Sequence, residues 1–449
     1  MPQINPAIFK AYDIRGRYPA ELNEGSAYLV GRAFAHFLKA RKIVAGYDCR
    51  ESSPSLFDSF VRGVIEEGTE VHALGLASTP YVYFAANQAD YDGAVNISAS
   101  HNPPEYNGFK LTRARAVPMS GETGLQDLLR LSQEGVPNAH VPAGQVVRKD
   151  YLGTYVDSIT RGRIIHGLKV AIDTGNGMAG TTTPRVLERF PDVQVVPLFT
   201  ELDGRFPNHL ANPLEESTLD ALKAAVNREK CDLGVAFDGD GDRVAFVTAA
   251  GQVVRGDVMT ALLAERQLRK HAGAIIGYDL RSSWAVPEAI RAAGGEPIQT
   301  RVGHSFIKAL MREKGAHFAG ELSMHYYFKD FYYTDNGDYA MLELLELITE
   351  TKKPLSELIA PFVKYHQSGE INLKVTDPAA LLAAVEAHFR DGKIEHLDGL
   401  SIDYPDWHLN LRASNTEPVV RLNMEAKASE VLKAKRNELA ELIAPFRAS

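Results

Sequence analysis

The sequence predicts an α/β protein: three related α/β modules with mainly parallel sheets, then a C-terminal α+β domain with an antiparallel sheet, arranged around a central cleft. Three observations predict this. Most of the chain alternates short apolar strands with helical patterns, which is typical of parallel sheets. One strand–turn–helix segment recurs along the chain, and the element order changes from about residue 371. The chain of 449 residues is also too long for a single core.

The first module contains the clearest example of the repeated segment. An apolar strand over 42–47 leads into a polar turn, and Ser53 is expected to cap a helix that begins at Pro54. Gly68 is expected to end this helix, and the next strand begins at Glu70. A strand, a capped helix and a second strand in this order indicate a parallel βαβ unit.

Residues 46–50 (GYDCR) have a counterpart in 277–281 (GYDLR), which also follows a strand, expected over 274–276, and precedes a helix. A weaker copy lies at 168–177, where the strand 168–173 runs into a Gly-rich turn. Chance similarity is the alternative, but the shared strand–turn–helix context favours a repeat. We therefore place domain boundaries near residues 145, 251 and 366. The expected domains are 1–145, 146–251, 252–366 and 367–449.

The last domain follows a different pattern. From about residue 371 the sequence predicts a strand, a helix over 378–389, strands over 400–404, 407–411 and 419–424, and a closing helix over 429–445. Strands that follow one another without a connecting helix are typical of an antiparallel sheet.

Composition excludes several functional classes. Apolar residues make up 45% and charged residues 24% of the chain, as in an ordinary globular protein. The net charge of −8 argues against a nucleic-acid partner, which usually requires a basic surface. Two cysteines, Cys49 and Cys231, cannot form a disulfide framework, which favours a reducing compartment. With neither a leader-like N-terminus nor a membrane-spanning apolar run, we expect a cytoplasmic monomer or small homo-oligomer without a membrane partner.

A serine loop at 98–104 (SASHNPP) follows the apolar strand 93–97. The hydroxyl of Ser100 beside the imidazole of His101 pairs a candidate nucleophile with a candidate proton carrier. Lys110 follows a turn expected at 106–109, so its amine could face Ser100. A proline-rich turn with a hydrogen-bonded histidine is the structural alternative.

The strand 233–237 runs directly into an aspartate loop, Asp238-Gly239-Asp240-Gly241-Asp242-Arg243. Three carboxylates at alternate positions can surround one cation with hard oxygen ligands. A calcium-binding EF-hand is excluded, because its sixth position would be Arg243 rather than glycine and its twelfth Ala249 rather than glutamate. A solvated acidic turn is the alternative. Carboxylates together with a phosphate oxygen suit Mg²⁺.

Two further loops carry polar groups of the kind that bind sugar and phosphate. In 320–323 (GELS), which follows a strand expected over 316–319, Glu321 and Ser323 point the same way and could bind neighbouring sugar hydroxyls. The segment 412–418 (RASNTEP) supplies donors for a phosphate dianion. Taken alone, the segment 320–323 is a weak indication of a sugar site. An ordinary polar hairpin explains the segment 412–418 as well as a phosphate site does.

Together, the four loops resemble those of the α-D-phosphohexomutases of the phosphomannomutase/phosphoglucomutase type. The resemblance covers essentially the whole chain, begins with the segment 9–16 (FKAYDIRG), and continues through the serine, aspartate, sugar and phosphate loops in family order. It implies that Ser100 carries the phosphoryl group as a phosphoserine. It also implies that Asp238, Asp240, Asp242 and the phosphate on Ser100 bind Mg²⁺.

The resemblance implies functions for the other polar residues of these loops. Lys110 would be the general base, assisted by His101. Phosphosugar contacts would come from Tyr12, Arg15, Arg243, Arg281, His304, Glu321, Ser323 and His325, and phosphate contacts from Arg412, Ser414, Asn415, Thr416 and Arg421.

The reaction implied by the resemblance converts hexose 1-phosphate to hexose 6-phosphate, for mannose, glucose or both, with a hexose 1,6-bisphosphate as intermediate and activator. Phosphoglucosamine mutase is the alternative within the family, disfavoured by Leu322 where glutamine is expected. A Mg²⁺-dependent phosphatase and a non-catalytic sugar-phosphate sensor are the alternatives outside it. Met324 stands where glycine is expected, and could narrow the pocket or face away from it.

Overall fold

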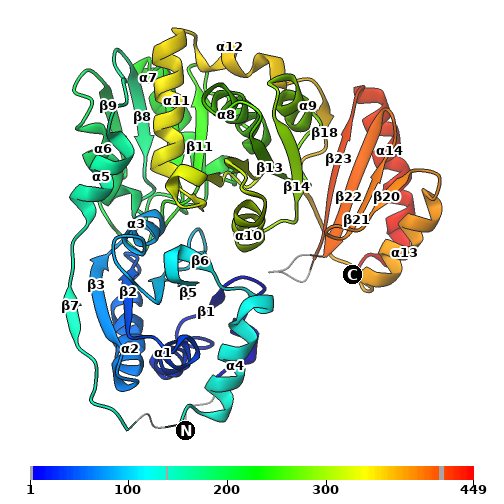
Figure 1. Cartoon of the computed structure of the whole chain (residues 1–449). Helices are drawn as coiled ribbons and strands as arrows, with labels where there is room; N and C mark the ends of the chain where they lie inside the picture. Colours follow the sequence, from blue (N-terminus) through cyan, green and yellow to red (C-terminus); the bar gives the residue numbers. More distant parts are fainter. Residues whose placement is uncertain (1–3, 138–139, 414–418, 449) are drawn as a thin grey trace.

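The computed structural model describes residues 4–137, 140–413 and 419–448, and it confirms the predicted fold class. Three α/β units, each with parallel strands on one side of its sheet and antiparallel strands on the other, are followed by a C-terminal unit whose sheet is antiparallel. Figure 1 shows the first unit (blue to cyan) below the second and third (green to yellow), with the C-terminal unit (orange to red) to one side.

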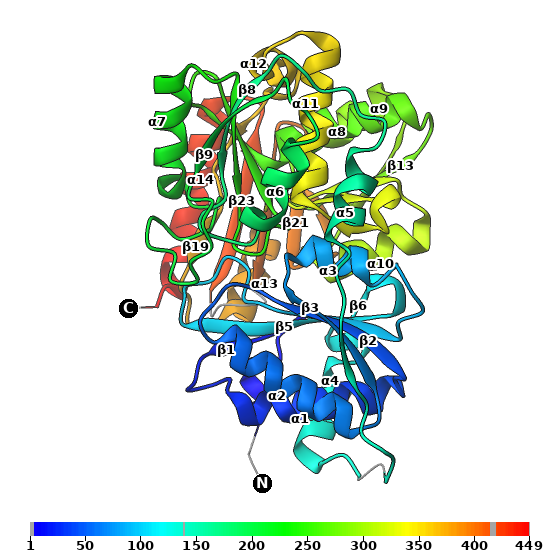
Figure 2. The ribbon, with the colours of Figure 1, turned by 90° about the vertical axis from the view of Figure 1, so that its left-hand side faces the viewer.

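The first sheet has a parallel centre formed by β4, β2, β3 and β7, and an antiparallel side formed by β5, β1 and β6. Its strands are, in spatial order, β1 (Ile14–Arg17), β5 (Tyr106–Arg113), β4 (Gly93–Ile97), β2 (Lys42–Tyr47), β3 (Glu70–Leu76) and β7 (Val146–Arg148), with β6 (Val117–Pro118) beside β5. Its helices are α1 (Glu24–Leu38), α2 (Ser53–Glu66), α3 (Thr79–Ala85) and α4 (Leu125–Glu134). Figure 2 shows α1, α2 and α4 on the face of this sheet away from the other units and α3 on the opposite face.

Two expectations for the first unit are wrong. Residues 106–109 form the start of strand β5 rather than a turn, because all four residues pair with residues 14–17 of β1 in an antiparallel ladder. The N-cap of α2 is Ser52, one residue before the expected position. The Ser53 hydroxyl instead donates a hydrogen bond to Asp48 at 2.5 Å, which fixes the turn after β2.

The second and third sheets share the same plan, with parallel strands on one side and antiparallel strands on the other. The second is ordered β12 (Val253–Val254), β11 (Val244–Thr248), β10 (Leu233–Phe237), β8 (Lys169–Asp173) and β9 (Gln194–Leu198). The third is ordered β14 (Glu296–Thr300), β13 (Ile275–Asp279), β15 (Phe318–Gly320), β16 (Tyr326–Phe328) and β17 (Thr334–Asp335). Their helices are α5 (Leu152–Thr160), α6 (Ala179–Leu187), α7 (Asp220–Glu229), α8 (Gly256–Lys270), α9 (Ala285–Ala292), α10 (His304–Lys314), α11 (Gly337–Thr351) and α12 (Leu355–Ile359).

The repeated sequence segment corresponds to a repeated turn. After β2, the Arg50 N–H donates to the Asp48 carboxylate at 3.1 Å, and after β13 the Arg281 N–H donates to Asp279 at 2.8 Å. The weaker copy has the same local bond, from Gly175 N–H to Asp173 at 2.8 Å. An aspartate that accepts a bond two residues on is a standard way to stabilise such a turn.

The C-terminal sheet contains a strand that the sequence did not predict, β20. Its strands are β18 (His366–Gln367), β23 (Val420–Ala426), β22 (Trp407–Ala413), β21 (Leu400–Asp403) and β20 (Lys393–Glu395) in spatial order, with β19 (Ile371–Leu373) also pairing with β23. Two helices, α13 (Pro378–His388) and α14 (Ser429–Ile443), accompany the sheet, as expected from the pattern.

The apolar core is divided unevenly among the units. The first and the C-terminal units each have a core of their own, whereas most of the buried apolar residues of the second and third units form one cluster that includes α11 and part of α3. A small separate cluster in the third unit includes residues of α10. Strands β4 and β10 are buried along their full length, because both faces of their sheets are covered. In the part of the chain that the structure describes, no helix is long and apolar enough to cross a membrane.

Candidate functional site

Residues from all four units line one cleft of about 620 Å³. The first unit contributes Lys110, the second Arg243, the third Glu321 and the fourth Arg421. Arg243 and Glu321 follow strands β10 and β15, at the strand ends where α/β proteins usually bind ligands, whereas Lys110 and Arg421 lie within strands β5 and β23. The polar lining suits a charged, hydroxyl-rich ligand rather than an apolar one.

Ser100 lies on the loop between β4 and β5 and is buried at 2% exposure. Its φ is +52°, the left-handed region that costs a residue with a side chain roughly 1–2 kcal/mol. The Ser100 Oγ donates to Asp238 Oδ2 at 2.7 Å and lies 3.3 Å from His101 Nδ1. A strained backbone that points a hydroxyl at both a carboxylate and an imidazole is consistent with a functional nucleophile.

Arg50, a residue that the sequence analysis did not select, holds the serine loop in place. Its buried guanidinium donates to the backbone carbonyls of Ser100, Asn102, Pro103 and Tyr106 at 2.6–3.0 Å. It is itself held by the Asp48 carboxylate at 3.1 Å. The loop is therefore fixed by one charged side chain rather than by regular secondary structure.

The aspartate loop brings its three carboxylates together at the base of the cleft. Oxygen atoms of Asp238, Asp240 and Asp242 lie within 4.8 Å of one another, and all three residues are buried. Gly239 allows the close approach of the serine loop, because a Cβ there would lie 2.4 Å from the carbonyl oxygen of Ser100. Asp240 Oδ1 has no hydrogen-bond partner among the described residues, so this buried oxygen is available to a cation.

The pKa of Asp238 reflects both its burial and its charged neighbours. Burial, together with the charges of Asp242 and Asp240, raises the pKa of Asp238 to about 8. Thr79, on the helix α3, donates a hydrogen bond to Asp240 and so orients one of the carboxylates. A crowded, buried set of hard oxygen ligands fits a divalent cation.

Lys110 places a positive charge beside the aspartate loop. Its ammonium donates to Asp240 at 2.6 Å and to Asp242 at 2.5 Å. Burial alone would lower the pKa of Lys110, but the charges of Asp240 and Asp242 outweigh it and raise this pKa well above its ordinary value. His101 differs, because burial and the nearby Arg243 lower the pKa of its imidazole well below the usual range.

The expected sugar loop connects β15 and β16, and Glu321 is its most constrained residue. The Glu321 carboxylate accepts from Tyr327 OH at 2.6 Å and from Gly303 N–H at 3.2 Å, and lies 2.9 Å from His325 Nδ1. His325 also contacts Asp242 at 3.2 Å, so it bridges the sugar loop and the aspartate loop. Burial and Arg243 would lower the pKa of His325, but the charges of Asp242 and Glu321 raise it to about 9.

Met324 faces away from the cleft. It belongs to the apolar core and is absent from the cleft lining, whereas its neighbours Ser323 and His325 line the cleft. Its φ is +67°, a conformation that glycine adopts without strain. The methionine therefore does not narrow the cleft.

Tyr12, Arg15 and His304 lie on the wall between the first and third units. The ring of Tyr12 packs edge-on against His304 with centroids 5.1 Å apart, and Arg15 is held by Asp13 and Asn102. Neither ring nitrogen of His304 has a hydrogen-bond partner within the described parts of the chain. Both nitrogens are therefore available to a ligand in the cleft.

Three arginines gather at the end of the cleft formed by the C-terminal unit. Arg281, Arg412 and Arg421 each form an ion pair with the carboxylate of Glu370, at 3.6, 3.4 and 3.6 Å. Burial alone would raise the pKa of Glu370, but these arginines outweigh it and lower the pKa. The three guanidinium ions form an anion-binding group. The Glu370 carboxylate, which the sequence analysis did not select, lies where a bound anion would lie.

Comparison with known families decides the assignment. Families described as phosphoglucomutase/phosphomannomutase, alpha/beta/alpha domains I, II and III, match residues 6–132, 151–251 and 255–365. The C-terminal domain of the same description matches residues 370–442. The chain belongs to the phosphoglucomutase/phosphomannomutase family. The resemblance noted in the sequence is thereby confirmed.

Individual members of this family are similar along the whole chain. A phosphomannomutase of Escherichia coli is 40% identical, with 97% of this chain and 98% of the relative covered. The "phosphohexose mutases" protein of Xanthomonas campestris pv. campestris strain B100 is 39% identical, with 97% and 98% covered. The crystal structure of a phosphoglucomutase/phosphomannomutase family protein from Burkholderia thailandensis is 33% identical, covers 98% of both chains and has a TM-score of 0.92.

The structure brings most of the expected site residues to this family cleft. All of the expected residues within the described parts of the chain line it, apart from the three aspartates, which lie at its base, and Arg412, which pairs with the lining residue Glu370. The other expected residues, Ser414, Asn415 and Thr416, lie outside the described residues. Of the residues that the sequence analysis missed, Arg50 could have been found, because it matches Arg281 in the repeated segment. Glu370 and Thr79 had no local signal, since their partners are distant in sequence.

Proposed function

We propose that this chain is a Mg²⁺-dependent phosphohexomutase that converts hexose 1-phosphate and hexose 6-phosphate reversibly, using Ser100 as the phosphoryl carrier. The observation that carries this proposal is the placement of Ser100. Its Oγ lies within hydrogen-bond distance of Asp238, at the base of a cleft whose far end holds three arginines. Phosphosugars are the substrates, and the family relatives named as phosphomannomutases support mannose phosphate as one of them.

The aspartate loop fits the metal. Asp238, Asp240 and Asp242, with an oxygen of phosphorylated Ser100, would hold Mg²⁺. The unpartnered Asp240 Oδ1 and the raised pKa of Asp238 support this assignment, because both indicate that a cation is needed to balance the buried carboxylates. When bound, Mg²⁺ neutralises the charge that builds up on the transferred phosphoryl group.

In the transfer step a sugar hydroxyl attacks the phosphorus of phosphorylated Ser100, and the bond from phosphorus to the Ser100 oxygen breaks. The attacking hydroxyl loses its proton to a neighbouring base. Lys110 is the expected base, but in the resting geometry its ammonium is bound by Asp240 and Asp242. Its function as a base therefore requires exchange of these bonds, while His101 beside Ser100 offers a second acceptor.

The far end of the cleft positions the substrate. Arg412 and Arg421, with Arg281, would bind the phosphate that does not react, and Glu321 with Ser323 would bind the sugar hydroxyls. Binding of the phosphate that does not react would supply binding energy for orienting the reacting hydroxyl. The hexose 1,6-bisphosphate formed in the first transfer must turn around so that Ser100 recovers a phosphoryl group from the other position.

The test compares kcat/KM for mannose 1-phosphate, glucose 1-phosphate and glucosamine 1-phosphate, with Mg²⁺ and a trace of glucose 1,6-bisphosphate. We expect turnover of mannose and glucose phosphates and at least about a thousandfold loss in Ser100→Ala, because the nucleophile is removed. Phosphosugar binding should persist in this variant. Full activity of Ser100→Ala would refute the phosphoserine, and release of inorganic phosphate without isomerisation would indicate a phosphatase. Turnover of glucosamine 1-phosphate alone would indicate the phosphoglucosamine branch.

A further inference from the structure

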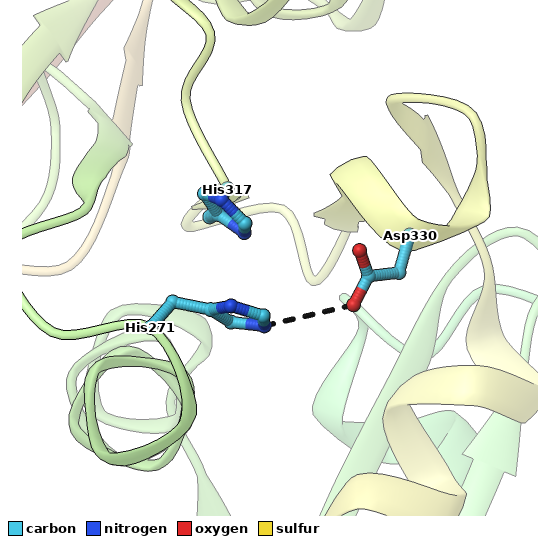
Figure 3. A group of neighbouring side chains, drawn as sticks. All are labelled: His271, His317 and Asp330. Carbon is cyan, nitrogen blue, oxygen red and sulfur yellow. Dashed lines mark ion pairs between the residues drawn. The ribbon is translucent and has the colours of Figure 1, made fainter.

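A second group of metal-ligating side chains lies on the third unit, outside the cleft. It consists of His271, His317 and Asp330, each of which has a ligand atom within 4.8 Å of the others. Figure 3 shows the two imidazoles one above the other, with the Asp330 carboxylate turned toward His271. None of the three lines the cleft, and the mutase chemistry proposed above does not use them.

The segments that carry the three side chains are joined by backbone hydrogen bonds. His271 follows the last residue of α8, and its N–H donates to Gln267 of that helix at 2.8 Å. The His317 N–H donates to Ile275 at 2.9 Å, and the Lys329 N–H, next to Asp330, donates to His317 at 2.9 Å. The ligand atoms are therefore presented by a connected scaffold rather than by independent loops.

The three side chains are close enough to share one ion, but at least one imidazole ring must turn to do so, because the two rings are stacked rather than directed at a common point. The two imidazole rings stack with centroids 4.1 Å apart and planes 29° apart, and His271 Nε2 lies 3.6 Å from Asp330 Oδ2. His271 and His317 are partly exposed and Asp330 is exposed, so an ion can enter from solvent and keep water as a further ligand.

The local charges also bear on cation binding. His271 caps the C-terminus of α8, where the helix dipole favours positive charge. Lys329 opposes metal binding by His317. Its ammonium lies 3.4 Å from His317 Nε2 and, since an ammonium can only donate, it occupies the lone pair of that nitrogen.

We propose that His271, His317 and Asp330 form a second divalent-metal site that takes Zn²⁺ or a similar first-row transition-metal ion. Two imidazoles and a carboxylate are a ligand set that suits such ions, whereas Mg²⁺ and Ca²⁺ prefer oxygen ligands alone. The ion would displace the Lys329 ammonium from His317. It would connect the end of α8 with the start of β15 and with the 3₁₀ turn Lys329–Phe331.

The test is a Zn²⁺ titration by calorimetry of the full chain in excess Mg²⁺, which keeps the oxygen ligands of the aspartate loop occupied. We expect His271→Ala and His317→Ala each to bind one Zn²⁺ fewer per chain than the wild type, or to bind it at least tenfold more weakly. His388→Ala is the matched control, because His388 forms an exposed pair with Glu438 at 2.8 Å. This variant should titrate like the wild type, and any Zn²⁺ bound in the cleft is common to all of the proteins.

Lys329→Ala should change the Zn²⁺ affinity in the opposite direction. It removes the competing ammonium without removing a ligand, so we expect Zn²⁺ to bind this site severalfold more tightly than in the wild type. Unchanged circular dichroism and unchanged mutase activity in Mg²⁺ would show that the variants are folded. Equal Zn²⁺ stoichiometry and affinity in the wild type, His271→Ala and His317→Ala would overturn the proposal, whatever the outcome for the phosphoserine mechanism.

Discussion

At the residue scale, Glu370 competes with any anion that enters the far end of the cleft. Its carboxylate pairs with Arg281, Arg412 and Arg421, and it is only partly exposed. A phosphate that binds there must replace the carboxylate in these pairs. Such an internal competitor would weaken the binding of any phosphate-bearing ligand at this end of the cleft.

Glu370→Gln should therefore strengthen inhibition by inorganic phosphate. Loss of the competing charge is expected to lower the inhibition constant roughly fivefold, or about 1 kcal/mol, as for a partly exposed ion pair. The inhibition constant is measured from competitive inhibition by inorganic phosphate in the mutase assay, with Glu441→Gln, a change of an exposed residue, as control. Weaker inhibition in Glu370→Gln would mean instead that this carboxylate is needed to hold the arginines in place.

Met324 shows how a residue can depart from the expected pattern without touching the site. Its side chain is buried at 7% exposure in the apolar core, and its backbone has a φ of +67°. Two opposing contributions act at this position. Burial of the side chain stabilises the fold by about 2–5 kcal/mol, while the left-handed backbone costs about 1–2 kcal/mol.

Met324→Gly should consequently lower the free energy of unfolding by about 1–3 kcal/mol, because the lost burial exceeds the relieved strain. Met324→Ala keeps the strained backbone and should be less stable than Met324→Gly by about 0.5–1 kcal/mol. Urea unfolding measures both variants. The ratio of mannose to glucose phosphate turnover should not change in either, and a changed ratio would place this residue in sugar selection.

At the element scale, the serine loop depends on a side chain from another turn. Arg50 belongs to the repeated turn after β2, and its guanidinium satisfies four carbonyl oxygens of the loop that holds Ser100. The equivalent Arg281 lies in the repeated turn after β13 and reaches the cleft instead. The arginine of the same type of turn thus supports a loop in one unit and lines the cleft in another.

Arg50→Lys should destabilise the chain and impair catalysis together. A lysine ammonium cannot reproduce the planar set of donors, so buried carbonyls lose their partners at a cost of about 2–4 kcal/mol. Urea unfolding and kcat are the measurements, and the exposed Arg130→Lys is the matched control. If Arg50→Lys retained both its stability and its kcat, the serine loop would be held by its backbone alone.

At the scale of the whole molecule, the site exists only where the units meet. Ser100 and Lys110 of the first unit approach the aspartate loop of the second, and His325 of the third contacts Asp242. The Val302 N–H of the third unit donates to Asp398 of the C-terminal unit at 3.0 Å. A cation that neutralises the aspartate loop would therefore stabilise the contact between units as well as the loop itself.

Mg²⁺ should raise the temperature of thermal unfolding, and EDTA should reverse the change. At about a hundred times its dissociation constant, a ligand of the folded state contributes up to about 2.7 kcal/mol. Asp240→Asn should abolish the shift, whereas Asp192→Asn, an exposed carboxylate of the second unit, should preserve it. A shift of the same size in Asp240→Asn would place the cation elsewhere.

The limits of sequence-based prediction are visible in particular elements. The strands Gly93–Ile97 and Leu233–Phe237 were predicted to the residue, because a buried strand between polar loops is apolar throughout. The short edge strand β20 (Lys393–Glu395) was not predicted, since three partly polar residues carry no periodic signal. The expected turn at 106–109 was wrong because pairing with β1, a distant contact, overrides the turn propensity of Asn107 and Gly108.

The sequence by itself determined the fold class, the family and the loops that carry candidate chemistry, because each of these depends on local patterns of residues. Only the tertiary structure decided which distant groups share a charge environment. It places Lys110 between two aspartates, Glu370 among three arginines and Met324 in the core. The physical reason is that electrostatic and packing energies depend on distances across the fold, which no local pattern of residues specifies.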